Sequence, residues 1–156
     1  MRTVAWLLLW ALGGIISPAL GANELGQKIF KERCSLCHQE DARGAAGVAP
    51  SLAGTLVPYL SRPEGKRYLA QILVSGMIGS IDTEGHKFNG LMPSFRAELS
   101  DTDIAAIINY VLGTFNGVSD AGTTTPIAPD DVTAAAASNP SSTGTRALRQ
   151  SLRAPP

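Results

Sequence analysis

The chain has 156 residues, with 13 basic and 13 acidic side chains and a formal net charge of zero. This length is typical of one modest domain with accessory segments, and the lack of a basic excess argues against nucleic acid as a partner. Aromatic residues make up 6% and charged residues 17%, so a small, aliphatic core is expected. A domain of this kind buries a low share of its surface and often needs a covalent staple.

Residues 1–22 have the pattern of a secretory signal peptide. Arg2 supplies a positive start, an apolar run extends from Val4 to Ile16, and Ala19-Leu20-Gly21 offers small residues for cleavage. The alternative is an uncleaved anchor, because no charge lies between Arg2 and Glu24 and a membrane span needs roughly 20 residues. Cleavage predicts a periplasmic protein, and membrane contact is expected only if the segment is retained.

A helix is predicted from Asn23 to Arg33, where apolar residues share one face. It leads into Cys34-Ser35-Leu36-Cys37-His38, which contains the only two cysteines of the chain. This spacing is the attachment motif of a c-type haem. Each thiol can form a thioether bond to one vinyl group of the porphyrin, and His38 is then held where its ring can ligate the iron.

Residues 39–54 are predicted to form a loop centred on Val48-Ala49-Pro50-Ser51-Leu52. A proline offers a carbonyl acceptor but no N–H donor. The Pro50 carbonyl can accept a hydrogen bond from Nδ1 of His38, which would leave Nε2 for the iron. The alternative is an ordinary turn proline.

Residues 58–65 are predicted as a turn and residues 67–75 as an amphipathic helix ended by Gly76. Residues 79–90 are polar and contain the turn pair Asn89-Gly90, so an irregular segment without strands is expected.

Met92 follows on a predicted loop, where Pro93 favours an extended backbone. A methionine usually fills a core, but this loop is far enough from His38 along the chain to reach the opposite face of a haem. Met92 is therefore predicted to be the second iron ligand. His86, six residues earlier, is a rival ligand, although a surface histidine is the simpler interpretation.

A further helix is predicted from Ser100 to Phe115, with one apolar stripe and a Ser100–Asp103 capping box. After it the composition shifts to Ser, Thr, Ala and Pro, which favours a disordered tail over residues 117–156. In the alternative, helices at 130–138 and 145–153 dock on a partner or on the protein's own surface.

These features, in this order, resemble the small class I c-type cytochromes of bacteria. The match covers roughly residues 23–116 and rests on the cysteine–histidine motif, the loop around Pro50 and Met92-Pro93. The resemblance implies an all-α fold of three to four helices wrapped round one haem c, which is attached through Cys34 and Cys37. Gly26 and Phe30 of the first helix would meet Tyr110 of the last. The domains expected are a signal peptide (1–22), a cytochrome c domain (23–116) and the tail (117–156).

Axial ligands on both sides leave the iron no open site, so it can only change between its ferric and ferrous states. A methionine ligand also raises the reduction potential. The predicted function is electron transfer between transient redox partners, without enzymatic activity. The alternative is the electron-accepting subunit of a periplasmic alcohol or aldehyde dehydrogenase complex, because the tail loosely resembles the extensions of such subunits.

Two remote alternatives use the cysteines differently. A thiol–disulfide oxidoreductase normally places this motif beside a βαβ pattern. A structural zinc site normally has four ligands, which here would be Cys34, Cys37, His38 and the distant His86.

Overall fold

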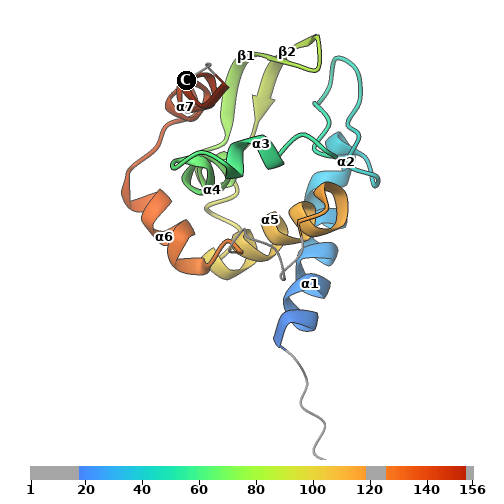
Figure 1. The fold of residues 1–156 in the computed structure, drawn as a ribbon, viewed down its shortest axis with the longest axis vertical. Helices are drawn as coiled ribbons and strands as arrows, with labels where there is room; N and C mark the ends of the chain where they lie inside the picture. Colours follow the sequence, from blue (N-terminus) through green and yellow to red (C-terminus); the bar gives the residue numbers. More distant parts are fainter. Residues whose placement is uncertain (1–17, 119–125, 154–156) are drawn as a thin grey trace, which may run out of the picture.

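The computed structural model of the chain describes residues 18–118 and 126–153 (Figure 1). Its helical elements are α1 (Pro18–Ile29), the π-helical turn η1 (Phe30–Cys34), α2 (Ser35–His38), α3 (Val57–Leu60), α4 (Gly65–Ser75), α5 (Asp101–Asn116), α6 (Pro129–Ala137) and α7 (Ser142–Arg153). Strands β1 (Met77–Thr83) and β2 (His86–Met92) form an antiparallel hairpin. Among the described residues, no helix is long and apolar enough to cross a membrane.

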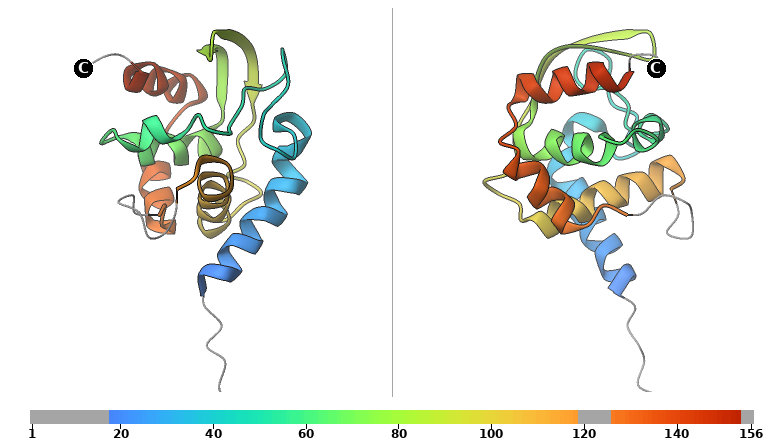
Figure 2. Two further views of the ribbon diagram at one scale, coloured as in Figure 1. Left: turned by 45° about the vertical axis from the view of Figure 1, so that its right-hand side comes forward. Right: turned by 60° about the vertical axis from the view of Figure 1, so that its left-hand side comes forward.

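Helices α1 and α5 cross in close contact, as the two views of Figure 2 show. Gly26 makes this approach possible, because a Cβ atom there would lie 2.3 Å from the carbonyl oxygen of Ala106. The rings of Phe30 and Tyr110 pack beside it, with centroids 5.7 Å apart. The predicted meeting of Gly26, Phe30 and Tyr110 is confirmed.

The first helix is longer than predicted. It begins at Pro18, within the predicted signal segment, of which residues 1–17 lie outside the described part of the chain. Helical backbone continues through η1 into α2, so Cys34 to His38 lie on one rigid element. A π-helical turn widens the helix locally and is frequent at functional sites.

The fold is mainly helical, as predicted, but the prediction of an irregular segment at 79–90 is wrong. β1 and β2 add a small sheet, paired in register from Met77 opposite Met92 to Thr83 opposite His86. Glu84 and Gly85 form the two-residue turn, with φ angles of 51° and 77°, and positive φ at both positions is the requirement of a type I′ hairpin. Each strand contains a glycine and several polar residues, which lowers its strand propensity. Contact of β1 with α7 adds stability to the hairpin.

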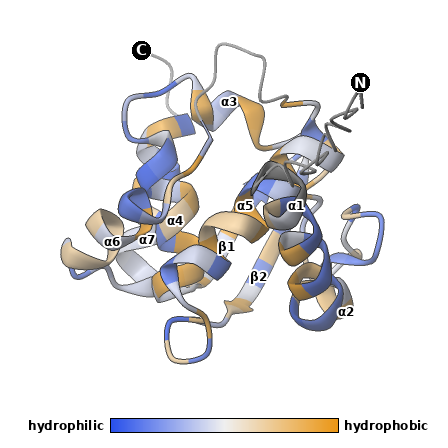
Figure 3. Ribbon diagram, turned by 90° about the horizontal axis from the view of Figure 1, so that it is seen from below, coloured by the Kyte–Doolittle hydropathy of each residue, from blue (hydrophilic) through white to orange (hydrophobic). Residues whose placement is uncertain are grey.

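Apolar residues of α4 and α5 form the centre of the core, and their ribbons lie in the middle of Figure 3. The predicted start of α5 is confirmed: Ser100 accepts a hydrogen bond from the Asp103 backbone, and the Asp103 carboxylate accepts one from the Ser100 backbone. α5 ends at Asn116, and Gly117 after it has the left-handed conformation common at helix ends.

Helices α6 and α7 lie where composition favoured a disordered tail. α6 packs against α4 and α5, while α7 packs against β1 and α4. Val132 and Ala135 of α6 and Thr145 of α7 are at most 1% exposed. The described part of the tail therefore docks on the protein's own surface, which was the alternative to disorder.

Candidate haem site

A cavity lies between the cysteine–histidine motif, the loop around Pro50, α3, α4 and the hairpin. It encloses about 1150 Å³ of empty space, part of which is open to solvent. Cofactor pockets in proteins typically measure roughly 300–1,000 Å³. All five residues predicted from the sequence to bind haem line this cavity: Cys34, Cys37, His38, Pro50 and Met92.

His38 is oriented by the loop that follows it. Its Nδ1 atom lies 3.0 Å from the carbonyl oxygen of Pro50, and because a carbonyl can only accept, Nδ1 carries the proton. The Nε2 lone pair is then free for a metal. Burial lowers the pKa of His38, and the contact with Pro50 opposes this. The ring is therefore held neutral, which is the form that ligates metals.

The loop itself is anchored by backbone hydrogen bonds. The amide of Gly44 donates to the carbonyl of His38 at 2.8 Å, and the amide of Leu52 donates to that of Ala42 at 2.8 Å. Ala42 is fully buried. These contacts close the loop on itself and fix the Pro50 carbonyl beside Nδ1 of the histidine ring.

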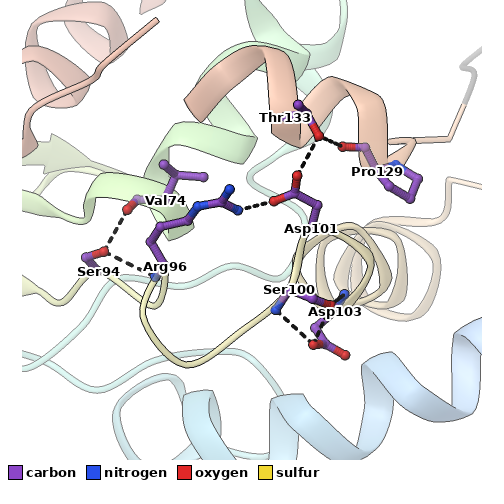
Figure 4. A network of polar contacts seen from close by, with 8 residues as sticks. All are labelled: Val74, Ser94, Arg96, Ser100, Asp101, Asp103, Pro129 and Thr133. Atoms are coloured by element: carbon purple, nitrogen blue, oxygen red, sulfur yellow. Dashed lines mark hydrogen bonds and ion pairs between the residues drawn. The ribbon is translucent and has the colours of Figure 1, made fainter. Parts of the chain in front are cut away.

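Met92 ends β2 on another side of the cavity. The chain reaches this position because Gly76, after α4, has a φ of 69° and leaves room for the Met92 backbone, which a Cβ at Gly76 would approach to 2.4 Å. Beyond Met92, Ser94 Oγ donates to the Val74 carbonyl at 2.6 Å (Figure 4). The Phe95 amide donates a hydrogen bond to the Leu73 carbonyl at 2.8 Å. The methionine loop is thus held against the end of α4.

The structure adds residues that the sequence did not single out. Met77 is paired with Met92 across the hairpin and lines the same cavity, where its side chain is buried. Tyr59, Tyr68 and Arg149 also line it, the last from α7. Prediction of the hairpin from the sequence would have placed Met77 opposite Met92. The position of Arg149 depends on the tertiary contacts of α7, for which the sequence offers no signal.

His86 is not brought to this cavity. It pairs with Thr83 at the hairpin end and lines an adjacent hollow with Arg43 and Glu84. Within the described ranges, no three His, Cys, Asp or Glu side chains gather as a metal-binding group. The four zinc ligands considered above therefore do not converge.

The cysteines differ in their surroundings. Cys34 is buried and Cys37 is exposed. Burial, with a smaller contribution from Cys37, raises the pKa of the Cys34 thiol to about 11. Thiols that exchange with disulfides have a lowered pKa, so this environment does not suit a thiol–disulfide oxidoreductase.

The donor set suits a haem. Two cysteines three residues apart can take two thioether bonds, and a neutral imidazole nitrogen and a thioether sulfur line the same cavity. The cavity is also mostly apolar around these donors, with Ile72, Ile81 and Phe88 among its lining residues. The residues present therefore fit a covalently attached porphyrin.

Comparisons with known proteins agree with a haem-binding site of this kind. The family model for cytochrome c matches residues 23–115. A cytochrome c-552 of Thermus thermophilus is 40% identical over 110 residues, covering 70% of this chain and 69% of that protein. A second cytochrome c-552 of the same species is 41% identical over 86 residues, covering 55% of this chain and 64% of the relative.

A third relative is the cytochrome c subunit of a quinone alcohol dehydrogenase from Gluconobacter oxydans. It is 29% identical over 91 residues, which cover 58% of this chain but only 18% of that subunit. The chain thus belongs to the cytochrome c family: it is an electron carrier that binds haem c covalently and exchanges electrons with redox partners.

Proposed function

We propose that this chain is an exported mono-haem cytochrome in which Cys34 and Cys37 form the thioether bonds while His38 and Met92 ligate the iron. The observation that carries the proposal is the shared cavity. It is lined by both cysteines, by Met92 and by a histidine whose Nδ1 is engaged by Pro50.

Haem iron supplies a one-electron couple when it is bound. The residues that ligate the iron determine whether it can also bind other molecules or can only exchange electrons. His38 is fixed by a backbone carbonyl and Met92 by a loop anchored to α4, so neither ligand is easily displaced. With both His38 and Met92 as ligands, the iron would have no open position for dioxygen or peroxide, which would restrict the protein to outer-sphere electron transfer.

The surface around the cavity supports transient partners. Val48 and Leu91 line the cavity and are 63% and 68% exposed, and Leu36, between the two cysteines, is 87% exposed. A few exposed apolar side chains suit the small interfaces of electron-transfer encounters. An electron donor and an acceptor would use this apolar rim in turn.

A second candidate is an electron-accepting subunit of a dehydrogenase. The similarity to the Gluconobacter oxydans subunit favours it. This candidate would use the tail to dock on a partner. The buried faces of α6 and α7, however, already contact α4, α5 and β1, which argues against that use. The free carrier is therefore the preferred function.

Export to the periplasm is part of the proposal and is supported by the signal pattern of residues 1–22. Determining the N-terminus of the mature protein tests it. A start close to residue 23 supports cleavage. An intact Met1 on a membrane-bound protein would support the retained anchor.

Purification from a host that attaches haem to cytochromes c tests the proposal as a whole. We expect a mass equal to the chain plus one haem, a reversible one-electron couple, and a ferric form that does not bind cyanide readily. Replacing both cysteines by alanine should abolish the mass shift. A colourless protein with two titratable thiols would refute the proposal. Co-purification with a dehydrogenase would favour the second candidate.

A further inference from the structure

Arg149 is a buried cation on α7, outside the segment that the cytochrome c family model matches. Arg149 is 6% exposed and lines the same cavity as His38 and Met92. An arginine stays charged in a protein, and a buried charge is costly unless an opposite charge accompanies it. The site therefore needs an anion.

The described residues do not supply that anion. One guanidinium nitrogen of Arg149 donates to the carbonyl oxygen of Asp82 at 3.2 Å, and the guanidinium carbon lies 5.9 Å from the ring centre of Tyr59. No carboxylate in residues 18–118 or 126–153 forms an ion pair with it. Arg33, the other arginine at the cavity, does have one, because Glu98 lies 2.8 Å away.

Tyr68 does not act as the anion either. Its hydroxyl lies close enough to Arg149 for the guanidinium charge to affect the pKa of Tyr68. Burial raises the pKa of Tyr68, with a further contribution from Tyr59, and Arg149 only partly opposes this. The phenol therefore stays neutral. An arginine has five N–H donors, and the hydrogen bond from Arg149 to the Asp82 carbonyl leaves donors for another acceptor.

We propose that Arg149 pairs with a propionate carboxylate of the haem, so that α7 contributes a cofactor-binding residue to the site. The inference rests on the proposed function, because it requires the haem to occupy this cavity. The haem brings two carboxylates, and a guanidinium can bind a carboxylate through two parallel hydrogen bonds. The Tyr59 ring of α3 lies beside the guanidinium, and the Asp82 carbonyl of β1 accepts a hydrogen bond from it.

The pairing couples the C-terminal helix to the redox centre. A propionate whose negative charge is balanced by Arg149 would stabilise the ferric form less than an unpaired propionate would. The pairing therefore favours a higher reduction potential. Thr145, one helical turn before Arg149, is fully buried and its hydroxyl lies 2.7 Å from that of Ser75. α7 is thus fixed to α4 where it presents Arg149 to the cavity.

The test measures the reduction potential of the full-length haem protein against pH for the wild type and three variants. Arg149→Gln removes the charge, Arg149→Lys retains it, and Arg153→Gln removes a charge from an exposed position of the same helix. Arg149→Gln should show a lower potential than the wild type at high pH, and a potential that falls as pH rises through the pKa of the propionate. Arg149→Lys should restore most of the wild-type profile, and Arg153→Gln should match the wild type.

Other titratable or charged groups also surround Arg149. Tyr59 and Tyr68 face it from α3 and α4, Asp82 contacts it through its backbone on β1, and Arg33 and His38 line the same cavity. All are present in all four proteins, so a step that appears only in Arg149→Gln belongs to the propionate. Identical profiles for Arg149→Gln and Arg153→Gln, with α7 merely less stable, would overturn the inference.

A measurement on the wild type decides the matter if the variants do not fold. In the ferrous protein, nuclear Overhauser contacts are expected between the Arg149 guanidinium protons and a propionate methylene. Contacts from the propionates only to other residues would refute the pairing. Haem attachment, read from mass and visible spectrum, is scored separately, so failure of this inference leaves the proposed function standing.

Discussion

Nδ1 of His38 and the carbonyl oxygen of Pro50 lie 3.0 Å apart, which joins the cysteine–histidine motif to the loop that follows it. Donation from Nδ1 makes the imidazole more basic and fixes its orientation. A more basic imidazole stabilises ferric iron. The strength of this one contact should therefore be visible in the reduction potential.

Replacing Pro50 by alanine keeps the carbonyl but frees the backbone that holds it. We expect a higher reduction potential, because the hydrogen bond loosens and the imidazole becomes a weaker donor. The free energy of unfolding should also fall by about 0.4–1 kcal/mol from the added freedom of the unfolded chain. Voltammetry and denaturant titration of the haem protein measure the two effects. Pro63→Ala, in an exposed turn, is the control. It should change stability alone, and an unchanged potential in Pro50→Ala would contradict the prediction.

Met92 and Met77 allow a matched comparison, because both line the cavity from opposite strands of the hairpin. Replacement of either by leucine nearly conserves volume and should cost less than about 1.5 kcal/mol of stability. Met92→Leu is expected to lower the reduction potential markedly and to let cyanide or imidazole bind the ferric protein, since the sulfur ligand is lost. Met77→Leu should change neither property. The reverse pattern would identify Met77 as the ligand.

The chemistry of the site could be predicted from the sequence because it is local. Cys34, Cys37 and His38 are fixed by spacing, and the start of α5 follows from Ser100 and Asp103. The close crossing at Gly26 followed from the family resemblance. Each of these depends on residues within one or two turns or on a pattern shared by a family.

The hairpin and the C-terminal helices could not be predicted in the same way. Gly79 and Gly90 pair with each other in the hairpin, and glycine disfavours strands. The position of α7 depends on long-range contacts such as that from Arg149 to the Asp82 carbonyl. The hairpin and the C-terminal helices are stabilised by tertiary packing, which cannot be predicted from composition. Met77 was missed for the same reason, because only the hairpin brings it opposite Met92.

Substituting Gly26 tests the helix crossing that carries the cysteine–histidine motif. A Cβ at Gly26 would lie 2.3 Å from the carbonyl oxygen of Ala106 and 2.7 Å from Tyr110 Cβ. Gly26→Ala should therefore destabilise the protein by roughly 1–3 kcal/mol, the usual range for overpacking. Gly113→Ala is the control, because its nearest contact would be 3.6 Å away on an exposed helix face. It should stabilise by about 0.5–1 kcal/mol, as expected from helix propensity. Equal unfolding midpoints for the two variants would argue against a close crossing.

Asp101 links α5 to α6 and to the methionine loop (Figure 4). Its carboxylate accepts hydrogen bonds from Thr133 of α6 and from Arg96. These contacts lower the pKa of Asp101 below its ordinary value of 3.8, with the Thr133 hydroxyl the larger cause. A lowered pKa in the folded state means that the ionised carboxylate stabilises the fold above about pH 3.8, and that this contribution is lost as pH falls through the lowered pKa.

Asp101→Asn should therefore reduce the free energy of unfolding at neutral pH by on the order of 1 kcal/mol or less, the scale of exposed pairs. The difference from wild type should shrink as the pH is lowered below the pKa of the free carboxyl group. Denaturant titrations of the haem protein at several pH values measure this. Asp130→Asn removes a carboxylate from the first turn of α6 and controls for the loss of charge at a helix start. A destabilisation of Asp101→Asn that stays constant down to strongly acidic pH would show that Asp101 acts through packing and not through its charge.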